Sequence, residues 1–147
     1  MAHVRKLIRD NIKTALTGLS TTGSKVYQSR VYPMGSAKLP GILLYNKSES
    51  VGYDTVSTPR LQTRVSEFEI EVYVKGNSNY DDTLDQICVE IEEALYTDLT
   101  RGGNALDTQI TTFDSDFSGS GDQPVAVARL TVEVRYQVRE NNPDVSI

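Results

Sequence analysis

Three aspartates near a glycine-rich turn are the first residues that could do chemistry. Asp114, Asp116 and Asp122 lie in a stretch that also contains Gly119 and Gly121. Their carboxylates could bind Ca²⁺ or supply the acid and base of a small hydrolase. The spacing does not match an EF-hand loop, which ends in a bidentate glutamate, and turns favour aspartate and glycine for backbone reasons alone. We therefore expect a turn here and no metal site.

The sequence contains one histidine, His3, and one cysteine, Cys88. Histidine is the commonest general base, but His3 stands close to a terminus, where we expect mobility rather than catalysis. Cys88 falls in an apolar stripe beside Ile87 and Ile91, where a buried thiol has a raised pKa and is a poor nucleophile. A lone cysteine also makes no intramolecular disulfide. We expect no catalytic residue, no cofactor and no enzymatic activity.

Two rows of charged residues indicate an interaction surface instead. The rows lie on two segments with alternating apolar and polar residues: Glu67, Glu69 and Glu71 in the first, and Arg129, Glu133 and Arg135 in the second. If these segments are neighbouring strands, each pair of opposite charges contributes about 0.2–1 kcal/mol, whereas consecutive glutamates repel one another unless cations lie nearby. The cations come either from the same chain or from another subunit, and the residue pattern leaves both possibilities open.

Apolar periodicity predicts the elements that position these rows. We expect helices at about 3–18 and 79–97, and strands at about 25–32, 41–46, 61–75, 107–117 and 125–138. The order α-β-β-β-α-β-β indicates an α+β fold in which two helices pack on one face of a mainly antiparallel sheet. The side chains expected to face the core are Phe68, Ile70, Val72 and Val74 in the third strand and Ala128, Leu130, Val132, Val134, Tyr136 and Val138 in the last.

Three polar segments connect or follow these elements. Residues 47–59 are expected to form a long loop, and loops of this length in compact domains are usually functional or disordered. Both readings stay open for this segment. Residues 118–124 have the composition of a hairpin connection, and residues 139–147 are expected to form a polar C-terminal tail.

Composition narrows the class of protein. A chain of 147 residues is expected to form one domain, 1–147. The net charge is −5 and the isoelectric point about 4.9, which argues against sequence-specific nucleic-acid binding. Arg5, Lys6, Arg9 and Lys13 form a local exception, for which a solvated helix face is favoured over a nucleic-acid contact. No segment has the character of a signal peptide or a membrane span, so we expect a soluble protein without a membrane partner.

Several segments together carry a family resemblance. They are Leu39-Pro40 before an apolar strand that ends at Tyr45, Arg60 before the acidic strand, Leu84-Asp85 with Ile91-Glu92-Glu93-Ala94-Leu95, and Gly121 to Leu130 leading into Tyr136. In this order and spacing they cover about residues 3–138. The chain resembles the lambda-like tail terminators, the minor tail protein U family of long-tailed bacteriophages.

The resemblance implies a mechanical function. Members of this family form a hexameric ring on the finished end of the tail tube, stop further addition of tube subunits, and present the surface to which the head is joined. The implied partners are other copies of the chain, the tail tube protein and a head-closure or neck protein. The implied location is the tail-neck region of the virion, after assembly in the host cytoplasm. An acidic ring wall would let DNA pass through without tight binding.

Candidate contacts with the ring or the tube can be drawn from the charged rows and the polar loop. They are Glu49, Tyr53, Asp54, Arg60, Arg64, Glu67, Glu69, Glu71, Arg129, Glu133 and Arg135. The alternative within the same particle is another neck, head-closure or tail tube component. The alternatives of other classes are a carboxylate-dependent hydrolase and a nucleic-acid binder that uses the basic first helix.

Overall fold

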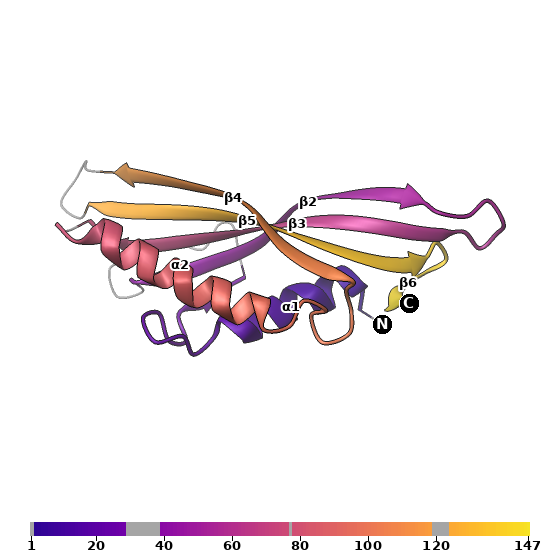
Figure 1. Cartoon of the computed structure of the whole chain (residues 1–147), viewed down its shortest axis with the longest axis horizontal. Coiled ribbons are helices and arrows are strands. Elements are labelled where there is room, and N and C mark those ends of the chain that lie inside the picture. The colour runs from indigo at the N-terminus through magenta and orange to yellow at the C-terminus, as the bar shows by residue number, and fades with distance from the viewer. Residues whose placement is uncertain (1, 29–38, 77, 119–123) are drawn as a thin grey trace.

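The computed structural model describes residues 2–28, 39–76, 78–118 and 124–147. Its elements are α1 (Val4–Leu16), β1 (Val26–Tyr27), β2 (Gly41–Tyr53), β3 (Leu61–Lys75), α2 (Tyr80–Tyr96), β4 (Asp107–Ser118), β5 (Val125–Arg139) and β6 (Asn142–Ser146). The predicted α+β class and the order α-β-β-β-α-β-β are confirmed, and β6 is an additional strand. Figure 1 shows both helices on the same side of the sheet.

Two long central strands organise the sheet. Its order is β1-β2-β3-β5-β4, and β6 also pairs with β5. β1 and β2 are parallel, whereas every other neighbouring pair is antiparallel. β3 and β5 have 15 residues each and pair without interruption from Leu61 opposite Arg139 to Lys75 opposite Val125. At about 3.3 Å per residue, each strand is about 50 Å long.

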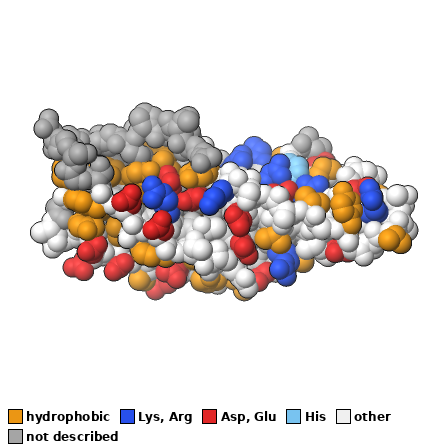
Figure 2. Space-filling view, turned by 90° about the horizontal axis from the view of Figure 1, so that it is seen from above, with side chains coloured by type: hydrophobic (Ala, Val, Ile, Leu, Met, Phe, Trp, Pro, Cys, Tyr) orange, Lys and Arg blue, Asp and Glu red, His pale blue; other side chains and the backbone are white. Residues whose placement is uncertain are grey.

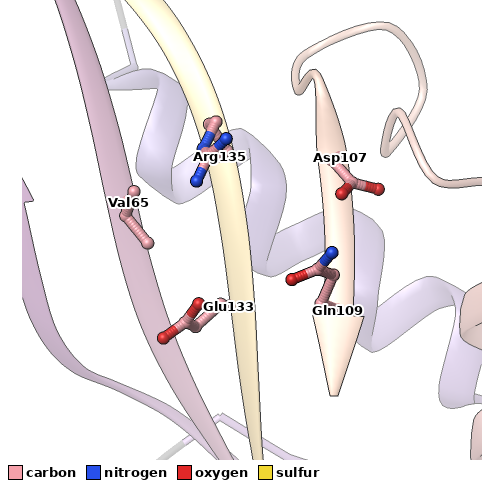
Figure 3. Close-up of a pocket in the computed structure, with 5 residues that line it drawn as sticks. All are labelled: Val65, Asp107, Gln109, Glu133 and Arg135. Atoms are coloured by element: carbon pink, nitrogen blue, oxygen red, sulfur yellow. The ribbon is translucent and has the colours of Figure 1, made fainter. Parts of the chain in front are cut away.

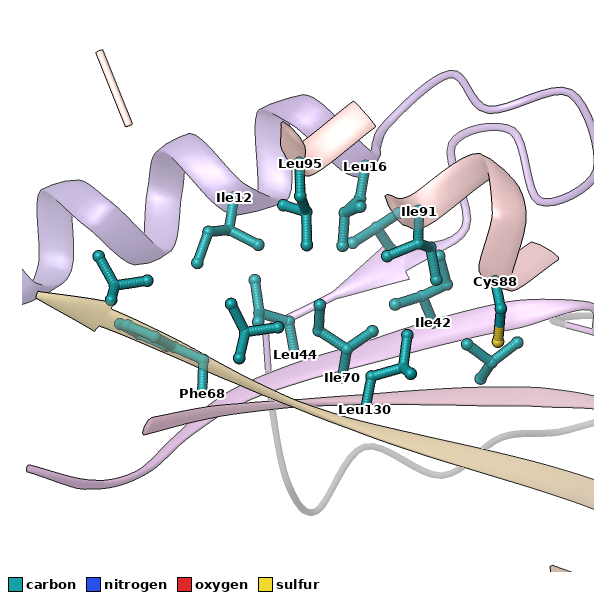
Figure 4. Packing of buried hydrophobic residues seen from close by; sticks show 14 of the residues in the cluster. Ile12, Leu16, Ile42, Leu44, Phe68, Ile70, Cys88, Ile91, Leu95 and Leu130 are labelled. Atoms are coloured by element: carbon teal, nitrogen blue, oxygen red, sulfur yellow. The ribbon is translucent and has the colours of Figure 1, made fainter. Parts of the chain in front are cut away.

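The core lies between the sheet and the two helices. α1 contributes Val4, Ile8, Ile12 and Leu16, which recur at helical spacing, and α2 contributes a similar stripe that includes Cys88. All the side chains that alternation turns toward the core in β3 and β5 are buried, as predicted. Figure 4 shows these layers meeting, with Ile12, Leu16 and Ile91 from the helices above Leu44, Ile70 and Leu130 from the strands.

The predicted loop at 47–59 is wrong for its first half. β2 continues to Tyr53 and pairs with β3 from Ser48 opposite Glu67 to Tyr53 opposite Gln62, so only 54–60 form a connection. Alternating apolar residues are absent here because this part of β2 is largely exposed and buries few side chains. Its strand conformation is instead supported by backbone pairing with β3.

The predicted polar tail at 139–147 is also wrong. Arg139 completes β5, and Asn142–Ser146 form β6, which turns back and pairs with β5. Of the strand predicted at 25–32, the structure assigns β1 at Val26–Tyr27, and residues 29–32 lie outside the described residues. Most of the predicted 118–124 connection lies outside them as well.

Candidate interaction surfaces

A hairpin formed by the second half of β2 and the first half of β3 extends beyond the helices. We call residues 48–67 the hairpin arm, and Figure 1 shows it at the end of the molecule opposite the start of α2. Its exposed apolar side chains are Val51, Tyr53 and Val56, of which Val56 is 98% exposed. The hairpin arm therefore exposes both polar and apolar side chains and buries few residues of its own.

A β-bulge at Lys47 determines which side chains of β2 face the helices. The register between β2 and β3 shifts between Asn46 and Ser48, so one residue of β2 is left without a partner. After the shift Glu49 lies opposite Ser66, on the same face as the buried Phe68. Without the bulge, simple alternation from Leu44 would place Glu49 on the other face. The bulge therefore aims a carboxylate at the helix side of the arm.

Glu49 binds three residues from three other elements. Its Oε2 accepts hydrogen bonds from Arg5 Nη1 at 2.6 Å and from Arg64 Nη1 at 3.3 Å, and its Oε1 accepts one from the Tyr136 hydroxyl at 2.6 Å. The Glu49 side chain is only 8% exposed. Burial and the neighbouring Glu49 carboxylate raise the pKa of Tyr136. This group, the Glu49 cluster, attaches the arm to α1 and to β5.

His3 extends the cluster at the start of α1. Its Nδ1 accepts a hydrogen bond from the backbone N–H of Arg5 at 3.1 Å, and its Nε2 lies 3.1 Å from Arg64 Nη1. Arg64 also donates to Gln62 Oε1 at 2.7 and 3.0 Å. Burial, followed by the charge of Arg5, lowers the pKa of His3. The expected mobility of His3 is therefore wrong, because the residue caps α1 and contacts the arm.

The base of the connection is held by a second ion pair. Arg60 Nε and Nη2 donate to the two carboxylate oxygens of Glu140 at 2.9 and 3.0 Å, and this bidentate contact lowers the pKa of Glu140. The Arg60 guanidinium also lies 4.5 Å from the centre of the Tyr53 ring. Asp54 accepts hydrogen bonds from Thr63 and Gln137. These predicted contact residues thus bind one another and the end of β5.

On the sheet face away from the helices, two of the three glutamates in the predicted row have cationic partners within the chain. Glu71 accepts hydrogen bonds from Tyr45, Tyr73 and Arg129 at 3.0–3.1 Å, and Glu69 lies 3.7 Å from Lys47 Nζ. Both glutamates are buried. Burial and Glu71 raise the pKa of Tyr73 to about 12. For these two residues the intrachain alternative is the one that the structure contains.

Glu67 is different, because it faces another glutamate. It lies directly opposite Glu133 in the β3–β5 ladder, where like charges destabilise the pair. Glu67 accepts a hydrogen bond from Ser48 Oγ at 3.2 Å, but within the described residues neither glutamate forms an ion pair, and Arg135 forms none either. Figure 3 shows Glu133 and Arg135 beside Val65 at a small pocket. Figure 2 shows mixed acidic and basic side chains along this face.

Two of the three aspartates that were considered for metal binding or hydrolysis lie on a strand. Asp114 and Asp116 lie on the exposed edge strand β4, opposite Arg129 and Val127, and Asp122 lies outside the described residues. Among residues 2–28, 39–76, 78–118 and 124–147, no three His, Cys, Asp or Glu side chains form a group that could hold a metal ion. None of the helices in these ranges is long and apolar enough to cross a membrane.

Comparison with solved structures finds a similar chain in the structure named "Virion of native gene transfer agent (GTA) particle". The two sequences are 18% identical, the match covers 90% of this chain and 92% of that chain, and the TM-score is 0.45. A similarity at this level gives no basis for assigning a function. No family model matches the sequence, and no curated protein matches it.

Proposed function

We propose that this protein is a tail terminator of a long-tailed bacteriophage. It forms a hexameric ring on the end of the tail tube, stops the addition of tube subunits and offers a surface to a head-closure or neck protein. The proposal is supported by the sequence resemblance over about residues 3–138 and by the element order that the residue pattern predicts. In this proposal the protein acts by assembly, without catalysis, and resides in the tail-neck region of the virion.

The ordered, projecting hairpin arm is the main structural support for the proposal. A ring subunit that meets a layer of tube or neck subunits needs a projection that keeps its shape before contact, since ordering a loose segment on binding costs free energy. The Glu49 cluster and the Arg60–Glu140 pair hold the arm at both ends. Val51, Tyr53 and Val56 remain exposed on it and are available to a partner.

Unpaired charge on the outer sheet face offers a second contact for the same partners. Glu67 and Glu133 repel each other in the isolated chain, so a cation supplied by a tube or neck protein would relieve that repulsion. Exposed Arg135 would accept a carboxylate in the same way. In this proposal, the exposed apolar residues of the hairpin arm and the charged residues Glu67, Glu133 and Arg135 contact tube or neck proteins and not the neighbouring subunits of the ring.

Tube capping can be tested directly by electron microscopy. Purified tail tubes are mixed with the wild-type protein, and rings at tube ends and the distribution of tube lengths during polymerisation are measured. We expect six-fold rings on the ends and shorter tubes than in the absence of the protein. Tubes that lengthen by incorporating the protein would identify a tube component, and protein that binds heads but never tubes would identify a head-closure component. Either result would overturn the proposal.

A matched pair of variants tests the role of the arm. Val56→Asp places a charge on the exposed tip of the arm, and Val145→Asp makes the same change on exposed β6. Both side chains contribute little to the core, so both variants should fold, which circular dichroism checks. We expect Val56→Asp to lower capping at least tenfold and Val145→Asp to leave it unchanged. Equal capping by both variants would exclude the arm tip as the tube contact.

A further inference from the structure

The two helices carry opposite charge. Every charged residue of α2 and of β4 is acidic, namely Asp81, Asp82, Asp85, Glu90, Glu92, Glu93, Asp107, Asp114 and Asp116. The charged residues of α1 are Arg5, Lys6, Arg9, Lys13 and a single acid, Asp10. A net charge of −5 for the whole chain therefore conceals a strong separation of charge between its parts.

Two acidic residues of α2, Asp85 and Glu92, lie on the side of the helix that follows the edge strand β4. The Tyr96 hydroxyl accepts a hydrogen bond from the backbone N–H of Ile110 at 2.9 Å, which places this side of α2 along β4. Asp85, Val89 and Glu92 precede Tyr96 at spacings of three and four residues, so they share its side of the helix. All four are exposed. Together with β4 they form a surface that we call the acidic edge.

The acidic edge also exposes apolar surface and an open strand. Val89, Tyr96 and Phe113 are each about half exposed, at 47%, 45% and 53%. β4 is the last strand in the sheet order, so its outer backbone edge has no strand partner within the described residues. Exposed apolar side chains beside an unpaired strand edge are characteristic of a docking site for another chain.

The basic residues of α1 lie at the other edge of the sheet. Arg5 binds Glu49 of β2, and Arg9 Nε donates to Gln28, which follows β1, at 3.3 Å. Lys6 and Lys13 are exposed on the same side of α1 by helical spacing. β1 pairs only with Ile42 and Leu43, so in the described part of the chain β2 has no strand on its outer side beyond Leu43. We call this surface the basic edge.

We infer that the acidic edge of one copy binds the basic edge of the next copy, head to tail. This inference rests on the proposed ring, because it names the contact that would build it. The two edges lie on opposite sides of one sheet. A contact between two like edges would bring equal charges together. Each edge is therefore bound by the edge of opposite charge from a second copy.

Head-to-tail geometry follows from this pairing. An acidic edge that binds a basic edge leaves one free edge of each kind on every dimer, so further copies add until the rotation between subunits closes a ring. The contact joins exposed charges, so it weakens as salt screens them over about 10 Å at 0.1 M. The apolar residues Val89, Tyr96 and Phe113 would be covered within it and would limit that salt dependence.

Charge reversal at the two edges tests the inference. Variant A carries Asp85→Lys and Glu92→Lys, which replaces both exposed acids on the β4 side of α2 with lysines. Variant B carries Lys6→Glu and Lys13→Glu, which leaves α1 with a net negative charge. All four positions are exposed on helices, so the fold is retained. Mass measurement by light scattering should find that A alone and B alone fail to form rings, whereas a 1:1 mixture restores them with A and B alternating.

A matched control separates the edges from the outer sheet face. Glu67→Lys with Glu133→Lys changes the net charge by the same amount as variant A but alters only the outer face. This control should assemble as the wild type does. Rings that persist in A and B but are lost in the control would assign the contact to the outer face and overturn the inference.

A second mixture distinguishes head-to-tail contacts from symmetric ones. Variant C blocks the acidic edge with Phe113→Glu and Val89→Glu, and variant B blocks the basic edge. Only one productive contact remains between C and B, so the mixture should stop at 1:1 dimers. Dimers of either variant alone would show that one edge binds itself, which contradicts the inference.

The experiments on the edge contact and the experiments on tube capping can succeed or fail separately. Wild-type rings that cap tubes but are insensitive to all edge variants would leave the proposed function standing and refute the edge contact. Rings that depend on both edges but never bind tubes would establish the contact and refute the function.

Discussion

The Tyr136 hydroxyl donates a 2.6 Å hydrogen bond to Glu49 Oε1, although the two residues are 87 positions apart in the sequence. Tyr136 is fully buried in β5, and Glu49 reaches it from β2 across the intervening strand β3. This contact explains why a polar hairpin is ordered: its carboxylate is held by the central strand and by two arginines.

Removal of the Tyr136 hydroxyl should therefore weaken the protein measurably. We expect Tyr136→Phe to lower the free energy of unfolding in urea by about 1.5–3 kcal/mol, the usual range for a hydrogen bond to a charged group. Tyr80→Phe is the control, because Tyr80 acts through ring stacking on Phe117 with centroids 4.8 Å apart. A loss no larger for Tyr136→Phe than for Tyr80→Phe would show that the hydrogen bond adds little.

Deletion of Lys47 should disconnect the arm from the body. The deletion removes the bulge, so alternation turns Glu49 to the opposite face and leaves Arg64 without its carboxylate. Breaking a buried ion pair in this way costs about 3–5 kcal/mol, which urea unfolding measures. Lys47→Ala keeps the bulge and loses only the 3.7 Å contact between its half-exposed side chain and Glu69, so it should cost about 1 kcal/mol or less. Equal stability of the two variants would mean that the register does not depend on the bulge.

His3 should make stability depend on pH in a defined window. Folding lowers the pKa of His3 from its ordinary 6.5, so the unfolded chain takes up the proton first as the pH falls. Stability is therefore full above pH 6.5 and is lost from there downward until folded His3 is protonated. His3→Asn keeps a capping side chain and should remove this component from thermal unfolding measured between pH 8 and 5. A pH profile identical to that of the wild type would exclude His3 as its source.

Cys88 should report unfolding through its reactivity. Burial, with smaller contributions from Glu92 and Asp85, raises the pKa of its thiol from 9.0 to about 11. A shift of two units lowers the thiolate fraction about 100-fold at neutral pH. Alkylation by iodoacetamide should therefore be at least about 100-fold slower in the native protein than in urea. Comparable rates would indicate that this part of α2 opens readily.

The regular parts of the fold follow from residue pattern. Alternation in β3 from Phe68 to Val74 and helical spacing in α1 from Val4 to Leu16 each correspond to a fully buried face. Such patterns are predictive because a core selects side chains position by position. The residue pattern left open whether the two charged rows lie on neighbouring strands, and the structure pairs β3 with β5 and places Glu71 opposite Arg129.

The parts that sequence did not predict have a common physical cause. The second half of β2 and the short strand β6 are formed mainly by backbone pairing, so their side chains carry no periodic pattern. The position of Glu49 depends on a one-residue bulge, which alternation cannot reveal. Burial of Glu69 and Glu71 depends on neighbours that are distant in sequence. The signal that could have indicated the Glu49 cluster was a lone acidic residue in β2, with basic residues in α1 and β3.

The continuous pairing of β3 and β5 has a mechanical consequence. Ladder hydrogen bonds run perpendicular to the strands, so a pull along the strand axis loads all fifteen residue pairs in shear at the same time. A pull across the sheet would instead open the pairs one after another. Tension applied to the base of the hairpin would thus pass along the whole molecule without crossing a loop, and the chain would resist it most strongly in that one direction.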